Sequence, residues 1–176
     1  FETNLNQLKK NFYTSKLQNE ITQISDSHVG VGLEMRLIKK IDPVLGTASR
    51  YEPKFNNKIM PNAVRSNYFT VDLNGSRDEV YIVDKPNDDV VAPVYSGTGT
   101  LQLKTKSLGV VIAKDIGTID YDTGQLDILS LNIISISGTA NTQLRVVVTP
   151  HESSRNISTD ILVRATEEAT YAVFAQ

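Results

Sequence analysis

The stretch GTIDYDTGQLDIL, residues 117 to 129, decides the fold. Apolar and polar side chains alternate on both sides of a turn at residues 122 to 124, where Asp and Gly are typical turn residues. The side chains expected on the apolar face are Ile119, Tyr121, Leu126 and Ile128. The stretch therefore predicts an antiparallel hairpin with one buried face, which is a feature of construction rather than of catalysis.

Outward from this hairpin, the chain from Asn67 onward has the pattern of successive short strands. Asn74-Gly75 is a hairpin signal, and we expect Ser76-Arg77-Asp78 to lengthen its loop beyond two residues. The expected strands are 68–73, 79–84, 99–105, 109–114, 117–121, 125–131, 133–137, 144–149, 160–166 and 170–174.

The first part of the chain has a different period. Apolar residues recur at helical spacing in two stripes from Thr3 to Ile24, and Ser25-Asp26-Ser27 is expected to end the helix. The apolar face of an amphipathic helix must cover the sheet or another chain. We therefore take five residues of these stripes as candidate interface residues: Leu5, Leu8, Phe12, Leu17 and Ile21.

Between the helix and the later strands, residues 28–37 alternate strictly and predict a strand. Residues 46–66 show no sustained period and are expected to form a long ordered loop with one short strand. The predicted fold is α+β and β-rich, with an N-terminal amphipathic helix at 1–25. It is followed by a β-rich domain at 26–176, with mostly antiparallel strands in a sandwich or curled sheet.

The composition of the chain argues against several classes of function. The 176 residues carry a formal net charge of −2 and no Cys, so no thiol chemistry or thiolate metal site is expected. No basic excess favours nucleic acid, Tyr and Phe are not interleaved with Arg, and no apolar run is long enough to span a membrane. We expect neither nucleic acid nor membrane as a partner. Because the chain starts at Phe1 without a leader, we expect a piece of a longer protein.

The acidic residues of the hairpin are a candidate metal site. Asp120, Asp122 and Asp127 loosely resemble the start of a calcium loop, but the bidentate Glu at its end is missing. Turn formation by Asp and Gly explains the same residues. His28 and His151 have no neighbour at ligand spacing. We expect no metal and no cofactor, with an ion at the three aspartates left as an alternative.

No catalytic motif stands out. Ser96-Gly97-Thr98-Gly99 has neither the pattern of a nucleophile elbow nor that of a phosphate loop, and is expected to be the flexible start of a strand. The pairs Asp88-Asp89 and Glu167-Glu168 lie in polar runs typical of solvated turns. We therefore expect that the protein is not an enzyme. A hydrolase with dispersed carboxylates is kept as an alternative, behind the two functions given below.

Two stretches resemble a known family. They are HVGVGLEMRLIKKIDP, residues 28 to 43, behind the leucine-containing helix, and GTIDYDTG, residues 117 to 124. The second is similar to the I-D-Y-x-T-G hairpin of baseplate wedge proteins of contractile-tailed phages, the baseplate J-like group. Together they resemble the C-terminal part of the large wedge subunits of T-even-type phages.

The resemblance implies a structural protein of the virion that is assembled in the host cytoplasm. Wedge subunits of this kind pair with a second copy, join into a sixfold ring around the tail hub and bind other wedge proteins. The alternative is a β-rich receptor- or glycan-binding module of a tail fibre or adhesin. The absence of Trp counts against glycan binding, although Tyr can substitute for it.

Overall fold

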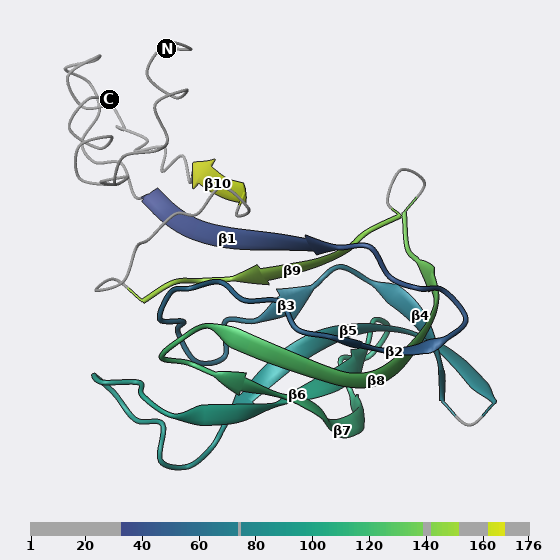
Figure 1. Cartoon of the computed structure of the whole chain (residues 1–176), viewed down its shortest axis with the longest axis horizontal. Coiled ribbons are helices and arrows are strands. Elements are labelled where there is room, and N and C mark those ends of the chain that lie inside the picture. The colour runs from purple at the N-terminus through teal and green to yellow at the C-terminus, as the bar shows by residue number, and fades with distance from the viewer. Residues whose placement is uncertain (1–32, 74, 139–141, 152–161, 168–176) are drawn as a thin grey trace, which may run out of the picture.

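The computed structural model describes residues 33–73, 75–138, 142–151 and 162–167, and in them the protein is all-β (Figure 1). These residues form ten strands and no helix. The strands are β1 (Leu33–Ile41), β2 (Ala48–Tyr51), β3 (Arg65–Ser66), β4 (Phe69–Leu73), β5 (Ser76–Pro86), β6 (Thr98–Thr105), β7 (Val111–Asp120), β8 (Gln125–Ile136), β9 (Leu144–Val148) and β10 (Leu162–Glu167).

Five of the strands close into a barrel. The pairing runs from β5 through β4, β8 and β7 to β6, and β6 pairs in turn with β5, which closes the ring. All these pairs are antiparallel. Closure removes most of the free edges that an open sheet of these strands would present.

The remaining strands extend the barrel. β3 pairs with both β5 and β9, and from there the sheet continues through β1 to β10 (Figure 1). β2 lies on β8, next to the hairpin that residues 117 to 129 form. The described sheet therefore ends at β10, which pairs only with β1.

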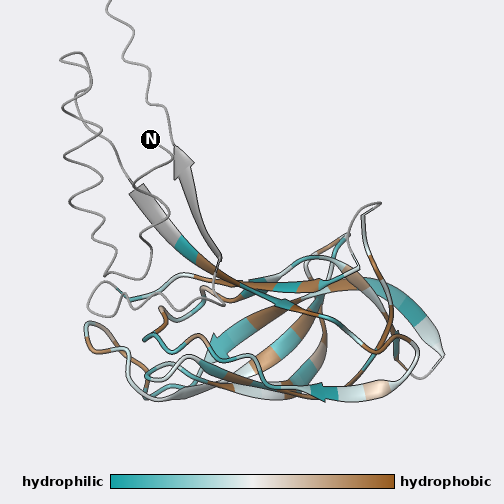
Figure 2. Cartoon of the chain, turned by 45° about the horizontal axis from the view of Figure 1, so that its top comes forward, coloured by the Kyte–Doolittle hydropathy of each residue, from teal (hydrophilic) through white to brown (hydrophobic). Residues whose placement is uncertain are grey.

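The core follows from the alternation of the strands, which Figure 2 shows as alternating hydrophobic and hydrophilic segments. Phe55, Phe69 and Tyr121 are the largest side chains that are fully buried, and aliphatic residues from every barrel strand fill the space between them. The hairpin prediction is confirmed: Ile119 pairs with Leu126, and the four side chains expected on its apolar face are buried.

The predicted fold class is wrong. The described residues are all-β, and a closed barrel takes the place of the expected sandwich or curled sheet in an α+β protein. The physical reason is that strand and loop side chains fill the described core by themselves, and the β5–β6 pairing closes the sheet. The helix expected at 1–25 and the strand at 170–174 lie outside the described residues.

Several element boundaries also differ from the prediction. Leu73 pairs with Ser76, so the hairpin has a two-residue loop, with Gly75 at φ 87°, and residues 76–78 belong to β5. The strands expected at 109–114 and 117–121 form the single strand β7, with Asp115 at φ 58° and a register shift against β6. Those expected at 125–131 and 133–137 form the single strand β8.

The segment expected to be a loop at 46–66 is more regular than its sequence suggested. It contains β2 and β3, and every second residue from Tyr51 to Ile59 is buried. Phe55 donates its backbone N–H to the carbonyl of Gly124, which places this segment against the hairpin turn. The strand expected at 28–37 is described from Leu33 onward and continues to Ile41 as β1.

Candidate functional site

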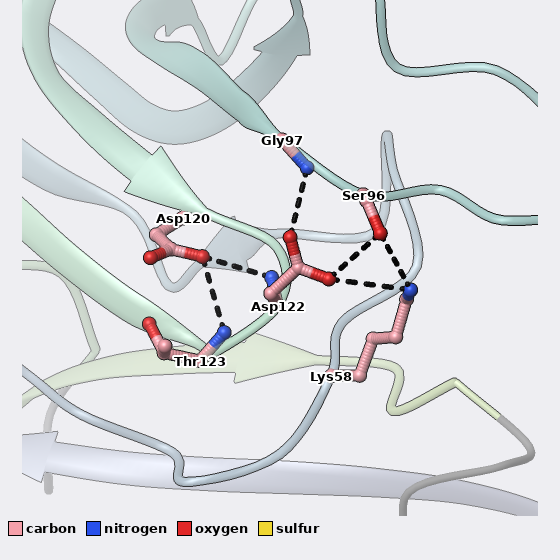
Figure 3. Close-up of polar contacts among 6 residues, drawn as sticks. All are labelled: Lys58, Ser96, Gly97, Asp120, Asp122 and Thr123. Atoms are coloured by element: carbon pink, nitrogen blue, oxygen red, sulfur yellow. Dashed lines mark hydrogen bonds and ion pairs between the residues drawn. The ribbon is translucent and has the colours of Figure 1, made fainter.

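The carboxylate of Asp120 stabilises the turn of the central hairpin. Oδ1 of Asp120 accepts hydrogen bonds from the backbone N–H groups of Asp122, at 2.9 Å, and Thr123, at 3.1 Å (Figure 3). Gly124 follows at φ 67°, and a Cβ there would lie 2.4 Å from the carbonyl oxygen of Asn57. Asp120 therefore serves the turn, and only Gly fits at position 124.

Asp122 lies at the centre of a polar cluster that joins three segments (Figure 3). Its Oδ2 accepts the N–H of Gly97 at 3.0 Å, and its Oδ1 accepts the hydroxyl of Ser96 at 2.9 Å. Nζ of Lys58 lies 3.3 Å from the same Oδ1 and 3.1 Å from the Ser96 hydroxyl. We call Lys58, Ser96, Gly97 and Asp122 the Asp122 cluster.

The carboxylate of Asp122 carries the negative charge of the Asp122 cluster. The N–H of Gly97, followed by Ser96 and Lys58, lowers the pKa of Asp122 below its ordinary value, so Asp122 is ionised at neutral pH. Through these contacts Asp122 holds together the segments that carry Lys58 and Ser96.

A second carboxylate, that of Asp84 on β5, is buried at 6% exposure. It accepts hydrogen bonds from the backbone N–H groups of Asn62, at 2.6 Å, and Val64, at 2.9 Å, and from the hydroxyl of Tyr121 at 2.7 Å. Burial, followed by the charge of Asp84, raises the pKa of Tyr121 well above its usual range, so the phenol stays protonated. Asp84 thus pins the segment before β3 to the barrel.

The three aspartates weighed as a calcium site do not converge. Asp120 caps the turn and Asp122 holds its cluster, whereas Asp127 forms two hydrogen bonds with Arg50, at 2.8 and 2.6 Å. The bond from Arg50 lowers the pKa of Asp127. Within the described ranges, no three His, Cys, Asp or Glu side chains are grouped so that they could hold a metal ion.

The other residues singled out from the sequence are scattered. The backbone N–H of His151 donates to the carbonyl of Lys58, and its ring lies edge-on to Tyr95 with centroids 5.9 Å apart. Asp88 and Asp89 are exposed in the loop between β5 and β6, as expected for a solvated turn. Glu167 lies at the end of strand β10 rather than in a turn. The remaining candidates lie outside the described residues: Leu5, Leu8, Phe12, Leu17, Ile21, His28 and Glu168.

The fold also assembles a surface cluster that the sequence analysis missed. The rings of Tyr68 and Tyr81 meet edge to face with centroids 5.6 Å apart. The guanidinium of Arg65 lies 4.7 Å from the centroid of Tyr81, and Nζ of Lys106 lies 5.0 Å from that of Tyr68. Lys106 also pairs with Glu79 at 2.8 Å. We call Arg65, Tyr68, Tyr81 and Lys106 the cation–aromatic cluster.

A sequence signal for this cluster existed. A two-residue loop at Asn74-Gly75 fixes the register of the hairpin, and with Phe69 opposite Val80 that register places Tyr68 opposite Tyr81. The longer loop expected from the sequence gives a different register, so it did not predict that Tyr68 and Tyr81 lie opposite each other. Neither Arg65 nor Lys106 could be placed beside them by local reasoning, because both reach the site from other strand pairs.

Comparisons of the chain with protein-family models, with curated proteins and with solved structures give no match. In the described part of the chain, no helix has the length and hydropathy needed to cross a membrane.

Proposed function

We propose that this chain is a structural subunit of a phage tail baseplate, which makes dimeric and ring contacts with itself, binds other wedge proteins and catalyses no reaction. The specific assignment rests on the resemblance of residues 28–43 and 117–124 to wedge subunits. In this proposal the protein belongs to the virion and passes through the host cytoplasm during assembly.

The structural observation that carries the proposal is the division between engaged polar groups and exposed apolar ones. Asp84, Asp120, Asp122 and Asp127 each bind groups of their own chain, an arrangement suited to stability rather than to chemistry. Large apolar side chains are nevertheless left in solvent, as is common at protein–protein contacts. They are Val44, Leu45, Val91, Val94, Leu108, Val110, Ile112 and Leu129.

The experiment is sedimentation or light scattering of the full chain over a range of micromolar concentrations. We expect a dimer or a higher symmetric oligomer whose population grows with concentration. Leu8→Asp in the expected N-terminal helix should weaken self-association or wedge binding more than it lowers the melting temperature. A strict monomer at every concentration would contradict the proposal.

A second function, glycan or receptor binding, is favoured by one observation. Tyr68 and Tyr81 form a half-buried aromatic pair on the barrel surface, and sugars stack on such rings. Against it, Arg65 and Lys106 already lie over these two rings. A glycan array separates the two readings: a monomer that binds one glycan, and loses it in Tyr81→Ala, would favour the alternative.

A further inference from the structure

Two surfaces of unlike charge lie at opposite ends of β6. One is the loop between β5 and β6, where Asp88 and Asp89 are exposed together with Val91 and Val94 at 62% and 60% exposure. We call these four residues the acidic loop. They include two carboxylates and no cation, so the loop offers negative charge beside apolar side chains.

The other surface is at the far end of β6, at the β6–β7 hairpin. Here Leu108 and Val110 are 82% and 53% exposed, and Lys106 donates its backbone N–H to the carbonyl of Glu79. A Cβ on Gly109 would lie 3.7 Å from the hydroxyl of Tyr81, so the hairpin tip adjoins the cation–aromatic cluster. We call the cluster together with Lys104, Leu108 and Val110 the tip surface.

The tip surface is cationic. Lys104 pairs with Tyr81 across β5 and β6 and therefore shares the outer face with it. Arg65, Lys104 and Lys106 bring three cations to this surface, and Lys106 pairs with the carboxylate of Glu79. Tyr and Arg are among the residue types that dominate the energy of protein interfaces, and on this surface they lie beside exposed leucine and valine.

The two surfaces cannot meet within one molecule. Strand β6 has eight residues, and at ~3.3 Å per residue its two ends lie roughly 23 Å apart. Each surface offers what the other lacks, because one joins apolar side chains to carboxylates and the other joins them to cations. Such complementary patches on one chain fit a contact between successive copies.

We infer that copies of this chain associate head to tail, with the acidic loop of one copy docked on the tip surface of the next. The inference rests on the proposed structural role and names the surfaces that serve it. A heterologous contact of this kind produces a ring when its rotation closes and a filament when it does not. Because opposite charges meet, the association weakens as salt concentration rises.

The test uses charge reversal in the full chain. The loop variant is Asp88→Lys with Asp89→Lys, and the tip variant is Lys104→Glu with Lys106→Glu. Each variant alone faces like charge at the contact and should self-associate about tenfold more weakly, or worse, than the wild type. Mixed in equal amounts they should assemble again, because each loop then meets a tip of opposite sign. Lys40→Glu, at an exposed position on β1, is a single charge-reversal control and should behave as wild type.

The outcomes separate this inference from the proposed function. Wild-type assembly together with unaltered assembly of either variant overturns the head-to-tail contact and leaves the structural role standing. Weak assembly of both variants without recovery on mixing also overturns it, because the two surfaces are then not partners. A wild-type chain that is monomeric throughout overturns both proposals. Circular dichroism and thermal melting of each variant confirm that the barrel is folded before assembly is compared.

Discussion

The hydroxyl of Tyr121 donates a 2.7 Å hydrogen bond to Oδ2 of Asp84, which ties the turn of the central hairpin to β5 over the intervening strand β6. Gly99 on β6 makes room for this bond, because a Cβ there would lie 2.7 Å from the Tyr121 hydroxyl. The same carboxylate holds the backbone of Asn62 and Val64. One buried acid therefore connects the barrel with the segment that precedes β3.

Tyr121→Phe removes the hydroxyl donor and leaves the buried Asp84 with only backbone partners. We expect the free energy of unfolding to fall by about 1–3 kcal/mol, the usual cost of breaking a buried hydrogen bond to a charged group. Urea unfolding at neutral pH measures it. Tyr68→Phe is the matched control, since its hydroxyl accepts an exposed bond from Arg65, and it should change stability much less.

The hydrogen bond between Tyr121 and Asp84 also predicts that the stability of the protein depends on pH in the alkaline range. The pKa of Tyr121 is raised in the folded protein, so the unfolded chain loses this proton first, near the ordinary tyrosine pKa of about 10. The stabilisation is complete below that pH and declines as pH rises further. The advantage of wild type over Tyr121→Phe should shrink by about 1.4 kcal/mol per pH unit above pH ~10. An advantage that is constant or grows from pH 9 to 11 would contradict this assignment.

Gly99→Ala places a methyl group 2.7 Å from both the carbonyl oxygen of Lys85 and the hydroxyl of Tyr121. We expect overpacking to lower stability by about 1–3 kcal/mol. In the double variant with Tyr121→Phe, part of the clash is removed, so the combined loss should be smaller than the sum of the two single losses. Strict additivity would show that the alanine strains only the backbone of Lys85.

Asp122→Asn tests the Asp122 cluster. The pKa of this carboxyl is lowered by the N–H of Gly97, so its stabilising effect is present above the ordinary pKa of about 3.9 and is lost as pH falls through the lower folded value. Because the side chain is 47% exposed, we expect a loss within about 1 kcal/mol at neutral pH. The difference from wild type should vanish in stronger acid. Thermal melts from pH 7 to 2 provide the comparison, and a deficit that persists at pH 2 would count against an ionic role.

Calcium titration of the full chain should give no binding heat up to millimolar concentration. Asp120, Asp122 and Asp127 each bind a separate partner, so no set of oxygens is left to converge on an ion. Heat that Asp122→Ala abolishes would reverse this conclusion and restore the calcium-loop interpretation of the hairpin.

Local patterns in the sequence were sufficient to predict which side chains are buried wherever a single hairpin buries one face. Alternation and the Asp-Thr-Gly turn predicted the burial of Ile119 and Leu126, because a one-residue slip would expose both. The same reasoning failed at Ser76, where the register depends on a two-residue turn. It also failed at Tyr51–Ile59, where the burial depends on pairing with strands that are distant in sequence.

Local sequence patterns could not predict the contacts that form the candidate sites. Asp122 was recognised as a turn residue, but its bonds to Lys58 and Ser96 arise from segments 64 and 26 positions away in the chain. Arg65 and Lys106 likewise meet Tyr81 and Tyr68 only after β3, β5 and β6 have paired.

By itself, the sequence determined that this chain forms short antiparallel strands with polar turns, because side-chain alternation and turn residues act over a few neighbours. Tertiary structure decided that these strands close into a barrel, that Asp84 is buried beneath Tyr121, and that opposite charges lie at the two ends of β6. These features depend on which distant strands pair, and that is set by the burial of the whole apolar surface at once.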